Sequence, residues 1–191
     1  KSKDPNLMDQ VKGYLKEKYK KPGNVFLGLV HRLDRPVSGI VLFAKTSKGA
    51  SRLSEQFRDH TIEKIYHALV LGKPDARTLM NYLAKDKAKK RADIGVEHGQ
   101  RAELEYEVVG SRGPYSLVKI LLKTGRFHQI RAQFSFAGFP VLGDTKYGAP
   151  FAFPDKSIAL AATSIAFTLP TKDERKTISI PIPKDWNQYK T

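Results

Sequence analysis

The chain is organised around residues 30–46, which read VHRLDRPVSGIVLFAKT. The single carboxylate in this stretch, Asp34, stands between Arg32 and Arg35. Nearby guanidinium charge favours the ionised form of a carboxylate, so we expect Asp34 to carry a negative charge. The same grouping also suits a structural salt bridge or a turn, because ion-pair networks gather charges without doing chemistry. From this stretch alone both interpretations stay open.

The residues after Asp34 predict its surroundings. Pro36 and Gly39 favour a turn, and the apolar run Ile40–Ala44 predicts a buried strand. Asp34 is therefore expected on a rigid loop at the start of a strand, where functional residues often lie.

The whole chain is strongly basic. Its 191 residues contain 34 Lys and Arg against 19 Asp and Glu, for a net charge of +15. Such an excess on a chain of this size favours a polyanionic partner, with nucleic acid first and an anionic membrane surface second. A basic protein that is merely soluble is the plain alternative.

Composition limits the other function classes. There are no cysteines, which excludes disulfides and thiolate chemistry and suits a reducing cytoplasm. We expect neither a membrane span nor a secretory leader, because no apolar run is long enough and the first 21 residues are polar and charged.

Periodicity predicts an α+β domain. Helical spacing favours helices over 6–20, after Thr46 and over 127–137. Apolar alternation favours strands; the segments are 64–72, 102–108, 118–122, 165–169 and 178–182. Strands outnumber helices and several follow one another as hairpins. We expect a mixed, largely antiparallel β-sheet core with flanking helices.

Two basic features are candidates for contact with an anion. The segment 85–91 holds five Lys and Arg in seven residues and is expected in an exposed loop or hairpin tip. A solvated charge run is the default interpretation of it, and phosphate contact is the sharper one. Arg126 is predicted near a helix N-terminus, where a cation opposes the helix dipole, so we expect it to face an anion or a carboxylate.

Familiar motifs of other enzymes are missing from the sequence. It has no HExxH zinc motif, P-loop or GxSxG elbow. HRLD at 31–34 is superficially like a kinase catalytic loop, but the glycine-rich loop and the DFG triplet are absent. His31 and Asp34 could supply two metal ligands, but no third is marked, and we expect no metal site.

Three segments occur together in an order that one family shares. They are HRLD (31–34) followed by SG (38–39), then KxYxAxVxG (64–72), then TGRxHQIR (124–131) with PVLGD (140–144) and YG (147–148) after it. Together they resemble the RluA-type RNA pseudouridine synthase family. The resemblance covers about residues 30–148.

The resemblance implies an isomerase that converts uridine to pseudouridine in structured RNA (rRNA or tRNA), without a metal or cofactor. It also implies a mixed β-sheet with an active-site cleft across it. By motif, Asp34 is the essential carboxylate, Tyr66 contacts the target base, Arg126 pairs with Asp34, and Arg32 helps to hold the flipped-out nucleotide. The other expected RNA contacts are His31, Arg35, Lys64, His128, Gln129 and Arg131.

Two departures from the family pattern stand out. Val37 occupies a position where family members often have threonine, so a hydroxyl there is dispensable or replaced. The apolar strand that precedes the first helix in the family is missing. We expect residues 1–191 to form a single catalytic domain without that strand and without a separate RNA-binding domain, acting as a monomer.

Two other function classes compete with the enzyme. A non-catalytic RNA-binding module would need the basic surface but not Asp34. A metal-dependent nuclease built on His31 and Asp34 would need a divalent ion, so EDTA would stop it.

Overall fold

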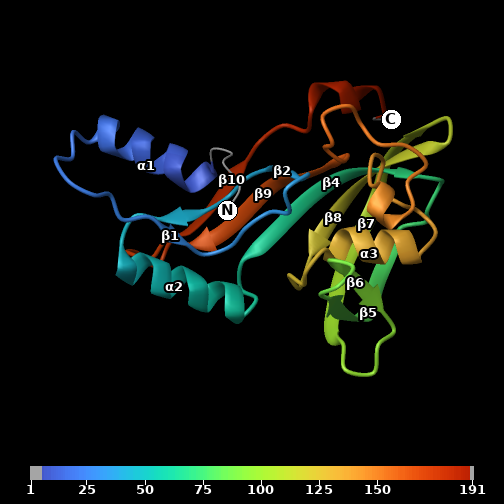
Figure 1. Cartoon of the computed structure of the whole chain (residues 1–191), viewed down its shortest axis with the longest axis horizontal. Coiled ribbons are helices and arrows are strands. Elements are labelled where there is room, and N and C mark those ends of the chain that lie inside the picture. The colour runs from blue at the N-terminus through green and yellow to red at the C-terminus, as the bar shows by residue number, and fades with distance from the viewer. Residues whose placement is uncertain (1–5, 190–191) are drawn as a thin grey trace.

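The computed structural model describes residues 6–189 (Figure 1). The helices are α1 (Leu7–Lys18), α2 (Ser47–Arg58) and α3 (Gln129–Phe136), with short 3-10 turns at Thr145–Tyr147 and Lys184–Tyr189. The strands are β1 (Gly28–Leu29), β2 (Ser38–Gly39), β3 (Phe43–Ala44), β4 (Glu63–Leu71), β5 (Arg77–Asp86), β6 (Arg91–Ile94), β7 (Gln100–Arg112), β8 (Tyr115–Leu122), β9 (Leu160–Thr168) and β10 (Arg175–Ser179).

One large sheet dominates the fold and confirms the expected class. Its strand order is β10-β9-β4-β8-β7-β5-β6, and every neighbouring pair in that order is antiparallel. The short strand β2 adds to it by pairing parallel with β9, so the sheet is mixed. A second, two-stranded sheet joins β1 to β3.

The helices lie at the two ends of the large sheet (Figure 1). At one end, α3 packs Phe134, which is fully buried, against Tyr106 of β7 with 4.9 Å between ring centroids. At the other end, α2 packs Leu53 against Ile165 and Phe167 of β9. The sheet therefore presents two apolar surfaces, each closed by a different helix.

The first two predicted helices are present, and a side chain caps the start of each. Asn6 caps α1 by accepting a hydrogen bond from the Asp9 amide at 2.9 Å. Thr46 caps α2 by accepting from the Gly49 amide at 3.0 Å. Both side chains satisfy a backbone donor that has no partner within the helix.

The expected buried strand Ile40–Ala44 is wrong in most of its length. Only Phe43–Ala44 pairs as a strand. The amide of Ile40 donates to the Ala162 carbonyl at 2.9 Å, whereas the amide of Leu42 donates to Nε2 of His31 at 2.8 Å. Because a side chain takes that donor, no ladder runs through the segment. Apolar composition alone could not reveal this competition.

The basic segment 85–91 lies where the sequence places it. Lys85 and Asp86 end β5 and pair with Ala92 and Arg91 of β6, so residues 87–90 form the tip of an exposed hairpin. This hairpin projects at the edge of the sheet beyond α3 (Figure 1). The late strand predicted over 178–182 ends at Ser179, because Pro181 and Pro183 follow and lack the amide donor.

Candidate active site

Two backbone hydrogen bonds hold the turn that carries Asp34. The Asp34 carbonyl accepts the Val37 amide at 2.9 Å, and the Pro36 carbonyl accepts the Ile158 amide at 3.0 Å. Gly39 then adopts φ of +120°, and a Cβ there would collide with the backbone of Ala162. Glycine permits this close approach of β2 to β9. The turn therefore holds Asp34 at a fixed place over the sheet.

Arg131 of α3 is the cation that meets Asp34. Its Nη1 donates to Oδ2 of Asp34 at 3.2 Å. Its Nε and Nη2 donate to the two oxygens of Asp144 at 2.6 and 2.8 Å. Arg131 is 5% exposed and Asp144 is 2% exposed. A buried guanidinium needs such paired carboxylates, and their charges raise the pKa of Arg131.

The expected pairing of Arg126 with Asp34 is wrong. The Nε of Arg126 donates to the Arg101 carbonyl at 2.9 Å. Arg126 precedes α3, and the left-handed backbone of His128 (φ 52°, ψ 25°) lies between it and the helix. Arg131 is the arginine that the helix presents to Asp34. Arg126 still lines a small cavity together with Asp34 and Tyr66.

Tyr66 enters the site from β4. The pairing of β4 with β9 shifts register between Ile65 and Tyr66, and such irregularities re-aim side chains beside functional sites. Burial, and then the negative charge of Asp34, raises the pKa of Tyr66 to about 12. The phenol is therefore protonated at neutral pH.

His128 reaches Asp34 from the start of α3. Its Nε2 lies 3.7 Å from Oδ2 of Asp34, and its Nδ1 lies 2.9 Å from the hydroxyl of Tyr147. Burial lowers the pKa of His128 to about 4; Arg131 and Lys146 lower it further, while Asp34 and Asp144 oppose the shift. The imidazole is neutral at neutral pH.

Three of the expected RNA contacts turn inward instead. His31 accepts the Leu42 amide and stacks on Phe57 with ring centroids 4.8 Å apart. Gln129 accepts from Thr124 and from the Arg126 amide. Both residues hold the loops that carry the site.

Lys64 is the third inward residue, at 9% exposed. Burial, and then the charge of Arg126, lowers its pKa to about 8. Among the described residues, no carboxylate lies within ion-pair distance of its ammonium. Composition could not distinguish these buried polar groups from a surface that contacts nucleic acid.

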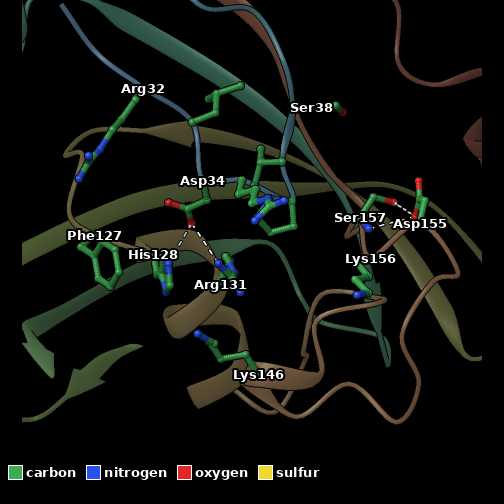
Figure 2. A pocket seen from close by; sticks show the side chains of 14 residues that line it. Arg32, Asp34, Ser38, Phe127, His128, Arg131, Lys146, Asp155, Lys156 and Ser157 are labelled. Atoms are coloured by element: carbon green, nitrogen blue, oxygen red, sulfur yellow. Dashed lines mark hydrogen bonds and ion pairs between the residues drawn. The ribbon is translucent and has the colours of Figure 1, made fainter. Parts of the chain in front are cut away.

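Asp34 lines three cavities: one of about 900 Å³ beside α1, and two others that His128 and Arg131 also line. The inner one, of about 110 Å³, is lined by Tyr66, Arg126, Asp34 and their neighbours. The outer one, of about 820 Å³, carries cationic side chains and the rings of Phe127 and of the neutral His128 on its walls (Figure 2). Those residues are Arg32, Arg35, Phe127, His128, Arg131, Lys146 and Lys156. Figure 2 shows Asp34 in the middle of this group, with His128 and Arg131 directed at it.

A cluster of metal ligands and a membrane-spanning helix are both absent from the described residues. Within 6–189, no three His, Asp or Glu side chains gather as candidate metal ligands. No helix in that range is long and apolar enough to cross a membrane. What the site does offer is a held carboxylate, a protonated phenol and a basic outer cavity. Such a set can act on a cationic or electrophilic carbon of a polyanionic substrate.

A comparison with known families identifies the chain. A family model described as RNA pseudouridylate synthase matches residues 2–136. The chain belongs to the RNA pseudouridylate synthase family. The resemblance to the RluA type is confirmed, since several relatives are named as synthases of that type.

Two relatives from bacteria illustrate the range of the family. The chain is 36% identical over 124 residues to a Borreliella burgdorferi protein named ribosomal large subunit pseudouridine synthase D, covering 63% of this chain and 38% of that protein. It is 31% identical over 183 residues to the Vibrio parahaemolyticus tRNA pseudouridine synthase C, covering 85% and 74%. In four of its bacterial relatives, the match to this chain covers between 38% and 55% of the relative's length.

Solved structures support the same fold. The human RNA pseudouridylate synthase domain containing 4 superposes with a TM-score of 0.76 at 22% identity, covering 96% of this chain and 81% of that one. The human domain containing 1 gives 0.72 at 23% identity. At these identities the likeness concerns the fold alone.

Two site residues of this family member received no role from the sequence. Asp144 and Tyr147 belong to the motifs that carry the resemblance, but their contacts were not expected. A signal for Asp144 was available, because Arg131 stands among apolar residues of a predicted helix and a buried arginine requires a carboxylate. No comparable signal marked Tyr147, which is 3% exposed.

Proposed function

We propose that this protein isomerises specific uridines in structured RNA to pseudouridine, with Asp34 as the essential carboxylate. The observation that carries the proposal is the position of Asp34 in the walls of both the inner and the outer cavity. Its side chain is 26% exposed, so it is accessible to a ligand while Arg131 holds one of its oxygens. Family membership supports the reaction class.

The reaction breaks the C1′–N1 bond, and N1 keeps the electron pair. The base then turns, C5 bonds to C1′, C5 loses its proton to solvent, and N1 takes up a proton. The carboxylate of Asp34 serves this sequence either by attacking C1′ or by stabilising its cationic character. Both routes require a negatively charged carboxylate that is directed at the sugar. The hydrogen bond from Arg131 holds the carboxylate of Asp34 in that orientation.

Tyr66 would complete the inner cavity. Its ring offers a stacking surface for a uracil, and its hydroxyl can pass a proton. Because the pKa of Tyr66 is about 12, its hydroxyl is protonated at neutral pH and does not act as a phenolate base. Arg126 on the same cavity would meet the base or its sugar phosphate.

The outer cavity suits an extruded nucleotide. A uridine in a helix is inaccessible, and turning it out costs a few kcal/mol. Cations on the rim of the outer cavity, namely Arg32, Arg35, Lys146 and Lys156, would offset this cost through phosphate contacts. Relatives are named for rRNA and for tRNA, so we propose structured RNA of either kind as the substrate.

The decisive test is Asp34→Asn. RNA tritiated at uridine C5 releases label to water when the C1′–C5 bond forms. We expect the wild-type protein to release tritium and the variant to release none, while still binding the RNA and keeping its circular dichroism spectrum. Release at the wild-type rate, from variant checked for deamidation, would contradict the role of Asp34. No release by the wild type from any cellular RNA would favour the non-catalytic binding module.

We further propose that residues 1–191 act as one catalytic domain, as a monomer, in the cytoplasm and without a metal ion. The absence of cysteine supports a reducing compartment. Light scattering gives the oligomeric state. Tritium release that survives EDTA supports the metal-free reaction, and release that EDTA abolishes and a divalent ion restores would contradict it unless the RNA fold needs that ion. Cleavage of the RNA chain that EDTA stops would favour the nuclease class.

A further inference from the structure

The hydroxyl of Tyr147 is buried between two partners. It accepts the Ala92 amide of β6 at 2.6 Å and lies 2.9 Å from Nδ1 of His128. His128 occupies the N-cap position of α3, yet its side chain makes no capping hydrogen bond. The ring instead lies between Tyr147 and Asp34, within hydrogen-bond distance of the first at 2.9 Å and in a longer contact of 3.7 Å with the second.

We infer that Tyr147 is a positioning residue that selects the Nε2-protonated form of His128 and thereby orients the carboxylate of Asp34. The inference rests on the proposed function, because it concerns how the reacting oxygen of Asp34 is presented. Tyr147 lines neither the inner nor the outer cavity and does not contact Asp34, so its effect on Asp34 passes through His128.

The direction of the hydrogen bonds supports this inference. The Ala92 amide can only donate, so the Tyr147 oxygen accepts from it and its own proton is free to point at Nδ1 of His128. A neutral imidazole that accepts at Nδ1 carries its proton on Nε2. That N–H then points at the Asp34 oxygen, 3.7 Å away.

The opposite tautomer leaves two groups poorly placed. With the proton on Nδ1, the Tyr147 oxygen would accept twice, and its own proton would lose the partner that the structure gives it. The lone pair of Nε2 would also face the negative Oδ2 of Asp34. Both consequences are unfavourable in a buried site.

The surrounding rings keep His128 and Tyr147 in place. Phe127 stacks on His128 with ring centroids 3.8 Å apart and planes inclined by 20°. The guanidinium carbons of Arg131 and Arg91 lie 5.0 and 5.3 Å from the Tyr147 ring centre. Burial raises the pKa of Tyr147 although the charges of Arg131 and Arg91 oppose that shift, so the hydroxyl keeps its proton and can donate it to Nδ1.

The consequence for Asp34 is a difference between its two oxygens. Both Arg131 and His128 approach Oδ2. Among the described residues, no hydrogen bond reaches Oδ1. Arg131 therefore holds Oδ2, the Nε2–H of His128 faces the same oxygen, and Oδ1 is left for the nucleotide.

The first test reads the tautomer directly. Long-range proton–nitrogen NMR of protein labelled with ¹⁵N histidine distinguishes the two nitrogens, and His128→Gln identifies the signals of His128. We expect the wild type to show a proton on Nε2 and an unprotonated Nδ1. A proton on Nδ1 in the wild type would overturn the inference, whether or not the protein is active.

The second test separates positioning from folding. Tyr147→Phe should change the tautomer population and lower kcat roughly tenfold or more, with KM changed less than about twofold. In His128→Gln, an amide can still donate toward Asp34 from about the place of Nε2. Adding Tyr147→Phe to that variant should therefore cost little further. An equal loss of kcat in both backgrounds would show a merely structural role and overturn the inference.

Discussion

Arg131 and Asp144 form a bidentate ion pair inside the protein, with Nε–Oδ2 and Nη2–Oδ1 distances of 2.6 and 2.8 Å. Their side chains are 6% and 2% exposed. Two of the three guanidinium nitrogens are thereby fixed, and the third, Nη1, is directed at Asp34. Asp144 sets the orientation of the cation that the site uses, although it lines none of the cavities beside Asp34.

Asp144→Asn should therefore damage both stability and turnover. Removing one charge of a buried pair leaves the other uncompensated, which typically costs about 3–5 kcal/mol. Urea denaturation measures this loss, and tritium release measures turnover. In Arg131→Met/Asp144→Leu, stability should return in part because apolar groups replace the pair, while turnover stays low. Recovery of turnover in that double variant would contradict the role of Arg131.

Arg126→Met should lower turnover less than Arg131→Met does. Arg126 donates to a backbone carbonyl and only lines the inner cavity, whereas Arg131 contacts the carboxylate itself. Single-turnover rates and RNA affinity measured for both variants provide the comparison. A larger loss of turnover in Arg126→Met would restore the pairing that the motif had implied.

Arg32→Ala should matter most when the target uridine is stacked or paired. Arg32 is exposed and lines all three cavities that Asp34 lines, where it can support an extruded nucleotide. Turnover is compared on a structured hairpin and on a flexible single strand with the same target. Equal losses on the two RNAs would count against a role in extrusion.

RNA binding should weaken steeply with salt, because neutralised phosphates release counterions. If the basic segment 85–91 touches phosphate, changing its four lysines to glutamine should flatten the slope of log K against log salt. These are Lys85, Lys87, Lys89 and Lys90. A matched control changes Lys48, Lys172, Lys176 and Lys184, of which Lys176 lies in β10 at the opposite edge of the sheet. Identical slopes in the two variants would mean that the segment is only solvated.

Stability should fall as the pH drops from about 6.5 to about 4. Burial, and then the charge of Lys64, lowers the pKa of His31 to about 4 in the folded protein, so the unfolded chain binds more protons in this range. The stabilisation is complete above the unfolded pKa and is lost as the histidine must charge. His128 contributes in the same direction.

His31→Gln keeps an acceptor for the Leu42 amide and removes the titration. Urea unfolding between pH 4 and 7.5 should then show a slope reduced by up to about 1.4 kcal/mol per pH unit. Equal slopes in the variant and the wild type would show that His31 does not titrate differently on folding.

The sequence by itself determined the architecture of this protein to a large extent. The helix start at Thr46, the alternation in β4, β7 and β8, and the basic hairpin all depend on a few neighbouring residues, so local patterns revealed them. The position of Asp34 on a turn was also local, because Pro36 and Gly39 constrain the backbone directly.

The tertiary structure decided which charges meet. Arg126 and Arg131 are equally basic in the sequence, and only the start of α3 after the left-handed His128 directs Arg131 at Asp34. The inward turn of His31, Lys64 and Gln129, and the contacts of Asp144 and Tyr147, depend on partners 3 to 55 residues away in the chain or on burial itself. Hydrogen-bond direction and burial are set only in the packed structure, so residue type and spacing could not specify them.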